Sequence, residues 1–194
     1  IGIGGAGSGG VTVNNSTHAQ QMVSSVQSIV TNFGVNGVDI DLEPGSSSWT
    51  QSALREVCLS LKSIYGSGFV ISITTGLYGA YTANWMNFLN ALGHNNYDYT
   101  GPMLYDFPES MDSNTFIPVC RDKTNTMVNA GVPENKIVLG FMLQPAGQTN
   151  YYASRTYQVI LDGYNAAKAD HPGINGAYFW VDDIEDNRNW EFTR

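Results

Sequence analysis

Short apolar segments alternate with longer amphipathic segments along the whole chain of 194 residues. The apolar segments have the length of strands, and they cover residues 1–4, 35–42, 69–74, 99–105, 137–142 and 176–181. Their starts lie roughly 35 residues apart, which is about the length of one βα unit. This alternation predicts an α/β fold with a parallel sheet and helices on its outside.

The segments between these strands carry apolar residues at helical spacing. They predict helices over about 17–33, 48–65, 84–92, 114–129 and 155–169. Thr17 and Gln20 have the spacing of a capping box, so we expect the first helix to begin there. Since no linker or low-complexity segment interrupts the pattern, the sequence predicts one domain over residues 1–194.

Residues 38–43 place three carboxylates at alternate positions, with an apolar residue before each. In a strand, Asp39, Asp41 and Glu43 would project from one face, roughly 7 Å apart. At an effective dielectric of about 20, each neighbouring pair of charges would repel by about 2.4 kcal/mol. The three groups are therefore not expected to be ionised together near neutral pH, and a carboxyl group that retains its proton is what a general acid needs.

Pro44 and Gly45 end this strand, which would make Glu43 its last residue, at the carboxyl end. An open doubly wound sheet would bury the three carboxylates under helices, whereas a barrel opens them onto the active-site mouth. We therefore expect a (β/α) TIM-type barrel, although eight strands complete such a barrel and six are visible. A solvated face of an antiparallel sheet, or a cation site, remains the alternative interpretation of the acidic strand.

Composition narrows the classes of partner. The net charge is −8, which argues against nucleic acid and anionic membranes as partners. Charged residues make up only 13% of the chain, a pattern typical of secreted proteins that bind neutral polar ligands. We find no apolar run long enough to span a membrane and no Cys/His cluster with zinc spacing. Cys58 and Cys120 are expected to be buried, unpaired thiols.

Residues 36–43 resemble the Asp-Gly-x-Asp-x-Asp-x-Glu signature of family 18 glycoside hydrolases, the chitinase family. Other segments agree with motifs of that family in order and spacing: Gly2–Gly5, Met103–Asp106, Val138–Phe141 and Gly176–Trp180. The resemblance spans nearly the whole chain, as strands 3 to 8 of the barrel. It implies a barrel that lacks its first two βα units.

The resemblance implies a role for each matching residue. Glu43 would protonate the glycosidic oxygen, Asp41 would orient the N-acetyl group of the substrate, and Asp39 would set the charge state of Asp41. The implied substrate contacts are Tyr105 to the acetamide, Asp106 to a sugar hydroxyl, Met103 along the pocket, and Trp180 beneath the sugar. The implied reaction is retaining and substrate-assisted, and it uses no protein nucleophile, cofactor or metal.

The sequence departs from the family pattern in three places. Position 36 is Asn where the signature has Asp, and this change is expected to matter little. Position 2 is Gly where the family has a Ser that helps to hold the first aspartate, here Asp39. Strands 1 and 2 of the family's barrel are absent. Three explanations are open: the chain is an N-terminally incomplete piece, a second chain completes the barrel, or an open barrel is tolerated. The first explanation is favoured.

The implied function is hydrolysis of chitin or of β-1,4-linked N-acetylglucosamine oligosaccharides by a secreted, extracellular enzyme. Two alternatives stay open. One is an endo-β-N-acetylglucosaminidase that acts on N-glycans through the same motif. The other is a non-catalytic chitin-binding or carbohydrate-binding lectin on the same scaffold. The aromatic residues Tyr78, Tyr81 and Trp85 could serve either as sugar-stacking platforms or as packing.

Overall fold

The computed structural model describes residues 1–5, 10–105, 112–142 and 156–180. The chain divides into two compact units, residues 1–100 (the first unit) and residues 101–194 (the second unit). Each unit is described by itself below. Whether the chain is one domain, as the sequence predicts, stays a prediction.

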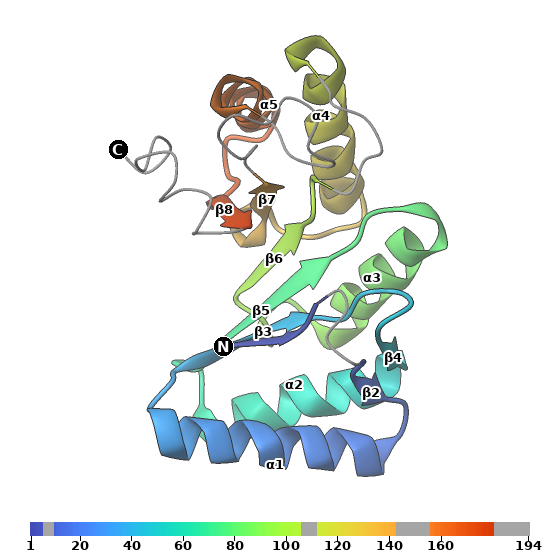
Figure 1. Cartoon of the computed structure of the whole chain (residues 1–194), viewed down its shortest axis with the longest axis vertical. Coiled ribbons are helices and arrows are strands. Elements are labelled where there is room, and N and C mark those ends of the chain that lie inside the picture. Colours follow the sequence, from blue (N-terminus) through green and yellow to red (C-terminus); the bar gives the residue numbers. More distant parts are fainter. Residues whose placement is uncertain (6–9, 106–111, 143–155, 181–194) are drawn as a thin grey trace. The chain divides into compact units, whose positions relative to one another are not determined.

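The first unit alternates strands and helices (Figure 1). Its elements are β1 (Gly2–Gly4), β2 (Thr12–Val13), α1 (Ser16–Phe33), β3 (Gly37–Asp41), β4 (Ser48–Trp49), α2 (Gln51–Tyr65), β5 (Val70–Thr75), α3 (Gly79–Leu92) and the beginning of β6 (Tyr99–Pro102). The sheet has the order β1-β3-β5-β6, and the register of its β1, β3 and β5 strands is parallel. β2 and β4 form a separate parallel pair. The predicted α/β character is therefore confirmed.

Apolar periodicity explains the packing of the first unit. Residues at helical spacing on α2, among them Leu54, Val57 and Leu61, have no exposed surface. The inner residues of β5, Ile71 and Ile73, are equally buried. The helices α1 and α2 lie side by side along one side of the sheet (Figure 1), so these apolar faces form one core.

An ion pair connects the end of α2 to the residue before β6, which in turn bonds to β5. The ammonium group of Lys62 donates to Asp98 Oδ2 at 2.7 Å and to the carbonyl oxygen of Phe69 at 2.7 Å. The same Asp98 oxygen accepts from the backbone N–H of Ile71 at 2.8 Å. The thiol of Cys58, also on α2, is buried, and burial raises its pKa to about 12. This thiol is therefore part of the hydrophobic core.

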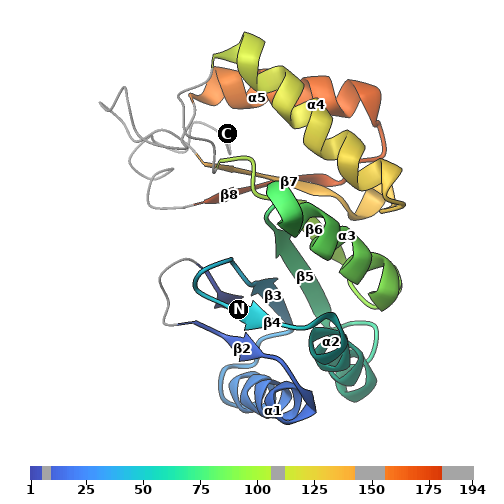
Figure 2. The same cartoon turned by 90° about the vertical axis from the view of Figure 1, so that its right-hand side faces the viewer.

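The second unit contains α4 (Ser113–Asn129), the 3-10 helix η1 (Glu134–Lys136), β7 (Val138–Met142), α5 (Tyr157–Asp170) and β8 (Gly176–Trp180). β7 and β8 pair in parallel, and α4 and α5 lie side by side in both views (Figures 1 and 2). The two helices approach closely at Gly163, where an added Cβ would lie 2.6 Å from Cys120 Sγ. Cys120 is buried, as predicted.

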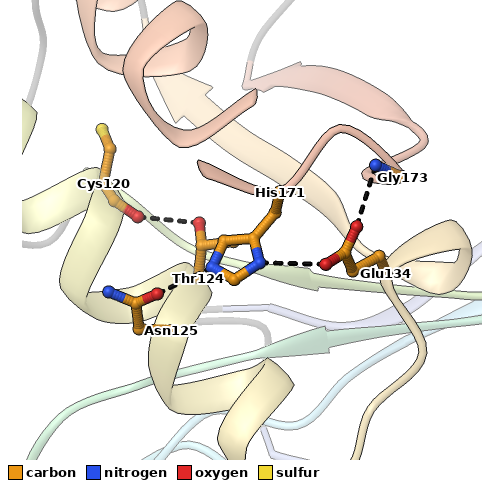
Figure 3. Close-up of polar contacts among 6 residues, drawn as sticks. All are labelled: Cys120, Thr124, Asn125, Glu134, His171 and Gly173. Carbon is orange, nitrogen blue, oxygen red and sulfur yellow. Dashed lines mark hydrogen bonds and ion pairs between the residues drawn. The ribbon is translucent and has the colours of Figure 1, made fainter. Parts of the chain in front are cut away.

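A hydrogen-bonded cluster fastens the loops of the second unit (Figure 3). His171, just after α5, places Nδ1 3.0 Å from Glu134 Oε1 and Nε2 2.7 Å from Asn125 Oδ1. The other oxygen of Glu134 accepts from the backbone N–H of Gly173 at 2.8 Å. The side chains of Asn125, Glu134 and His171 thereby join α4, η1 and the loop before β8. None of the described helices is both long enough and apolar enough to cross a membrane.

Candidate active site

The strand β3 separates carboxylates from aliphatic side chains as the alternation predicts. Val38, Ile40 and Leu42 are 0–2% exposed and belong to the core. Asp39, Asp41 and Glu43 are half-buried. One prediction needs correction: the strand ends at Asp41, so Glu43 is not its last residue. Pairing with β5 stops where Asp41 lies opposite Thr74, and the chain then enters the turn that Pro44 begins.

Two hydroxyl groups of the neighbouring strand hold Asp39. Ser72 Oγ donates to Asp39 Oδ1 at 2.6 Å, and Thr74 Oγ1 lies 3.3 and 3.2 Å from the two carboxylate oxygens. The register explains these contacts, because Ser72 lies directly opposite Asp39 and Thr74 is two residues further along the same face. Sequence reasoning missed both residues. The signal was present as two hydroxyl residues at period two, on a strand whose residues between and before them are apolar.

Position 2, where the family resemblance expects a serine, lies opposite Asp39 on the other neighbouring strand, β1. A Cβ added to Gly2 would meet nothing within 4 Å, so the glycine is not required by packing. The hydroxyl groups that bond Asp39 come instead from β5. Asp39 thus keeps hydroxyl donors although position 2 carries none.

Two glycines bring the backbone close to Asp41. The N–H of Gly5 donates to the carbonyl oxygen of Asp41 at 2.8 Å. Gly4 has a φ of 109°, and an added Cβ would lie 1.8 Å from the same oxygen. Only glycine satisfies both the positive φ and the close approach.

The turn after β3 fixes the backbone of Glu43. The N–H of Ser47 donates to the carbonyl oxygen of Glu43 at 2.9 Å. The hydroxyl of Ser46 lies 3.2 Å from the same carbonyl and 3.3 Å from that of Gly5. The turn therefore connects the candidate acid to the end of β1.

The candidate substrate contacts belong to the second unit. Met103 and Tyr105 follow β6 and are 4% and 9% exposed, and Met103 bridges to Gly140 of β7. Trp180 ends β8 with 55% of its surface exposed, unusual for so large an apolar ring. Asp106 lies outside the described residues. The structure thus groups the three carboxylates in one unit and Met103, Tyr105 and Trp180 in the other.

The aromatic residues after β5 have different surroundings. Trp85 is 1% exposed and packs against Trp49 with ring centroids 4.6 Å apart, so it is packing and not a sugar platform. Tyr78 and Tyr81 are half-buried, with centroids 6.0 Å apart. In the described part of the chain, no group of three or more His, Cys, Asp or Glu side chains is placed to hold a metal ion.

Comparison with known proteins identifies the fold of the chain through solved structures. No protein-family model matches the sequence, and no curated protein matches it. Among solved structures, a chitinase of family 18 from Crocus vernus has a TM-score of 0.75 at 15% identity, over 100% of this chain and 68% of that one. A fungal endo-β-N-acetylglucosaminidase from glycosyl hydrolase family 18 has a TM-score of 0.68 at 19% identity, over 92% and 62%. A family 18 chitinase from Cycas revoluta, solved with allosamidin, has a TM-score of 0.67 at 16% identity, over 95% and 76%.

The chain thus spans about two thirds of the length of these structures. The comparisons give no support to a second chain that completes the barrel. They confirm the predicted fold class and, at the level of the fold, the resemblance to the chitinase family. The chain has the (β/α)-barrel fold of the family 18 glycoside hydrolases over the part of that fold that it covers.

Proposed function

We propose that this chain is a chitinase-type glycoside hydrolase that cleaves β-1,4-linked N-acetylglucosamine by a retaining, substrate-assisted reaction. The observation that carries the proposal is the arrangement of β3. It presents Asp39 and Asp41 on the face opposite the core, with Glu43 two residues further along. The similarity in fold to family 18 chitinases supports the same conclusion.

In the proposed reaction, Glu43 donates its proton to the glycosidic oxygen as the bond from that oxygen to the anomeric carbon breaks. The acetamide oxygen of the substrate attacks the anomeric carbon from the other face, which gives an oxazolinium ion. Water then attacks the anomeric carbon and gives a proton to the Glu43 carboxylate. The oxazolinium ring opens, and the anomeric carbon keeps its original configuration. The substrate supplies the nucleophile, and the protein supplies the acid and then the base.

The two aspartates have supporting roles in this proposal. Asp41 binds the N–H of the acetamide and aligns its oxygen for attack. Asp39, which Ser72 and Thr74 hold through their hydroxyl groups, sets the charge state of Asp41 in this proposal. Two carboxyl groups on neighbouring positions of one strand face retain a proton between them more readily than isolated carboxyl groups do.

The proposed substrate contacts are Tyr105, Asp106, Met103 and Trp180. The exposed ring of Trp180 supports a role in stacking on a sugar, because a flat aromatic face suits a pyranose ring. We also infer that the protein acts outside the cell, where polymeric chitin occurs. The low content of charged residues supports this inference.

A second candidate is hydrolysis of the chitobiose core of N-glycans. The similarity to the fungal endo-β-N-acetylglucosaminidase supports it. Parallel assays on chitotetraose and on a high-mannose glycopeptide separate the two candidates. Chitinase action predicts chitobiose from the first substrate and no cleavage of the second, and the reverse pattern would favour the N-glycan enzyme.

Replacement of the acid tests both enzyme proposals and the lectin alternative. Glu43→Gln is expected to lower the rate of chitotetraose hydrolysis by roughly 10²–10⁴, because amide nitrogen cannot protonate the leaving oxygen. Glu56→Gln is the matched control, since Glu56 lies on α2 and accepts from Ser16 Oγ at 2.7 Å, a bond that glutamine can keep. A Glu43→Gln variant that hydrolyses as fast as the parent would show that Glu43 is not the acid.

A further inference from the structure

The first unit contains a pocket of about 260 Å³ that the proposed reaction does not use. Its lining residues come from the turn after Glu43, from β4, from the first residue of α2 and from α3. They are Ser47, Ser48, Trp49, Gln51, Tyr81 and Asn84. Asp39, Asp41 and Glu43 are not among these residues.

One wall of the pocket is aromatic and held in place from behind. The ring of Trp49 lies 4.6 Å from that of Trp85 and 5.6 Å from that of Phe88, centroid to centroid. Trp85 and Phe88 are 1% and 0% exposed, whereas Trp49 is half-buried. The core therefore fixes the orientation of Trp49, and a ligand would meet a ring that loses little freedom on binding.

The rest of the lining is polar and uncharged. Gln51 and Asn84 carry amides, and Ser47 and Ser48 carry hydroxyl groups. Ser48 Oγ is already oriented, because it accepts from the side-chain amide of Asn14 at 3.0 Å. A wall of aromatic rings, amides and hydroxyl groups without a charge matches a ligand that has apolar C–H faces and many hydroxyl groups and is itself neutral.

We propose that this pocket binds one ring of a neutral saccharide. The ring stacks on Trp49 and Tyr81, and its hydroxyl or acetamide groups bond to Gln51 and Asn84. The volume lies just below the roughly 300–1,000 Å³ of pockets for drug-sized ligands, which suits a single ring better than an oligosaccharide. In a chitinase, such a pocket would retain the enzyme on its polymer. This second step rests on the proposed function, whereas the binding of a sugar does not.

The pocket has a mechanical connection to the candidate acid. Ser47 lines the pocket, and its backbone N–H donates to the carbonyl oxygen of Glu43 at 2.9 Å. A sugar in the pocket would therefore contact the same turn that fixes the backbone of Glu43. This contact is the reason to expect the pocket to bear on polymer hydrolysis and not only on binding.

Nitrogen-15 NMR of the whole chain tests the binding directly, with N-acetylglucosamine and chitobiose as probes. We expect the resonances of the Trp49 indole N–H and of the side-chain amides of Gln51 and Asn84 to shift. These shifts should saturate at millimolar concentrations of sugar. Tyr81→Ala should weaken this binding by roughly tenfold, about the effect of losing one stacked ring. Asn87→Ala, exposed on the same helix and outside the pocket, is the matched control and should leave the binding unchanged.

Asn84→Ala is a second variant in case Tyr81→Ala fails to fold, because Asn84 is exposed and its replacement leaves the core intact. It should weaken binding in the same assay and lower the hydrolysis of insoluble chitin severalfold. Shifts that are equal in the parent and in both variants, or no shift with millimolar sugar, would overturn the proposal.

The same experiment on Glu43→Gln keeps the two proposals apart. Shifts at the pocket in Glu43→Gln would support the pocket without any turnover, whereas a parent chain that shows these shifts but does not hydrolyse chitotetraose would overturn the proposed function alone. Hydrolysis of chitotetraose without shifts at the pocket would support the function and overturn the pocket.

Discussion

Asp39 owes its position to side chains of the neighbouring strand. Ser72 Oγ makes the shorter of the hydroxyl contacts, 2.6 Å from Asp39 Oδ1. A hydrogen bond to a charged group is worth about 1.5–3 kcal/mol, more than one between neutral groups. Loss of this contact is therefore expected to affect both folding and the role proposed for Asp39.

Ser72→Ala tests this view. We expect the free energy of unfolding to fall by about 1–2 kcal/mol in urea titrations, since the half-buried carboxylate loses a donor. We also expect the pH profile of hydrolysis to shift, which simple loss of stability would not cause. Ser67→Ala, in an exposed turn, is the control. An unchanged pH profile in Ser72→Ala would contradict the positioning role.

Single residues were predictable from the sequence where the pattern was local. The alternation over residues 38–43 predicted which side chains face the core, and Val38, Ile40 and Leu42 confirm it. The partners of Asp39 were not predictable, because they depend on the register between β3 and β5, and no local pattern determines that register. Trp85 shows the same limit, since its burial depends on Trp49, far away in the sequence.

At the scale of elements, the cluster around Glu134 is a pH-dependent connection (Figure 3). The hydrogen bond with His171, and next the backbone N–H of Gly173, lower the pKa of Glu134 below its ordinary value of 4.5. A carboxyl group whose pKa is lowered on folding stabilises the fold above its unfolded pKa. That stabilisation is lost as the pH falls through the lower, folded value.

The Glu134→Gln variant should show this dependence. The difference in unfolding midpoint between parent and variant is expected to be largest above about pH 4.5 and to shrink as the pH falls below that value, where protonation removes the charge in the parent as well. Urea unfolding at a series of pH values measures it. A difference that is constant across this range would show that the charge of Glu134 contributes nothing.

The contact between α4 and α5 decides the sign of a second substitution. Gly163→Ala would raise helix propensity by roughly 1 kcal/mol at an open site. Here the new Cβ would lie 2.6 Å from Cys120 Sγ and 3.0 Å from the ring of Phe116, both fully buried. We therefore expect a net loss of about 1–3 kcal/mol from overpacking.

Thermal or urea unfolding measures this loss. The control is Asn165→Ala, exposed on the same helix, which should stabilise the protein by a few tenths of a kcal/mol through propensity alone. If Gly163→Ala were stabilising too, the close approach of the two helices would be wrong.

The α-helices were predicted correctly in number and order along the described chain, but their first residues were less predictable, and the 3-10 helix η1 was not predicted. The first helix begins at Ser16 with Asn15 as its N-cap, so the capping box expected at Thr17 is wrong. The expected start at 48 is also wrong: residues 48 and 49 pair with β2, and Thr50 caps α2. α3 begins at Gly79, five residues before the expected start, without a side-chain cap that could have marked it.

For the molecule as a whole, the regular spacing of strands was enough to predict the α/β class, whereas the choice of a barrel depended on the three carboxylates and on the family resemblance. Each βα unit repeats the same local pattern, so the class follows from the order of elements without any long-range contact. The candidate site was less predictable. The three carboxylates are close together in the sequence, on β3 and two residues beyond it, but Tyr105 and Trp180 lie in the second unit, and only resemblance links them to the same reaction.

The anomeric form of the first product tests the central proposal most directly. The purified chain is incubated with chitotetraose, and the released chitobiose is followed by NMR before mutarotation equilibrates it. Attack by the substrate acetamide followed by water predicts the β-anomer, because two inversions at the same carbon retain its configuration. Release of the α-anomer would require direct attack by water on the glycosidic carbon, and it would contradict the substrate-assisted reaction proposed for Glu43 and its two aspartates.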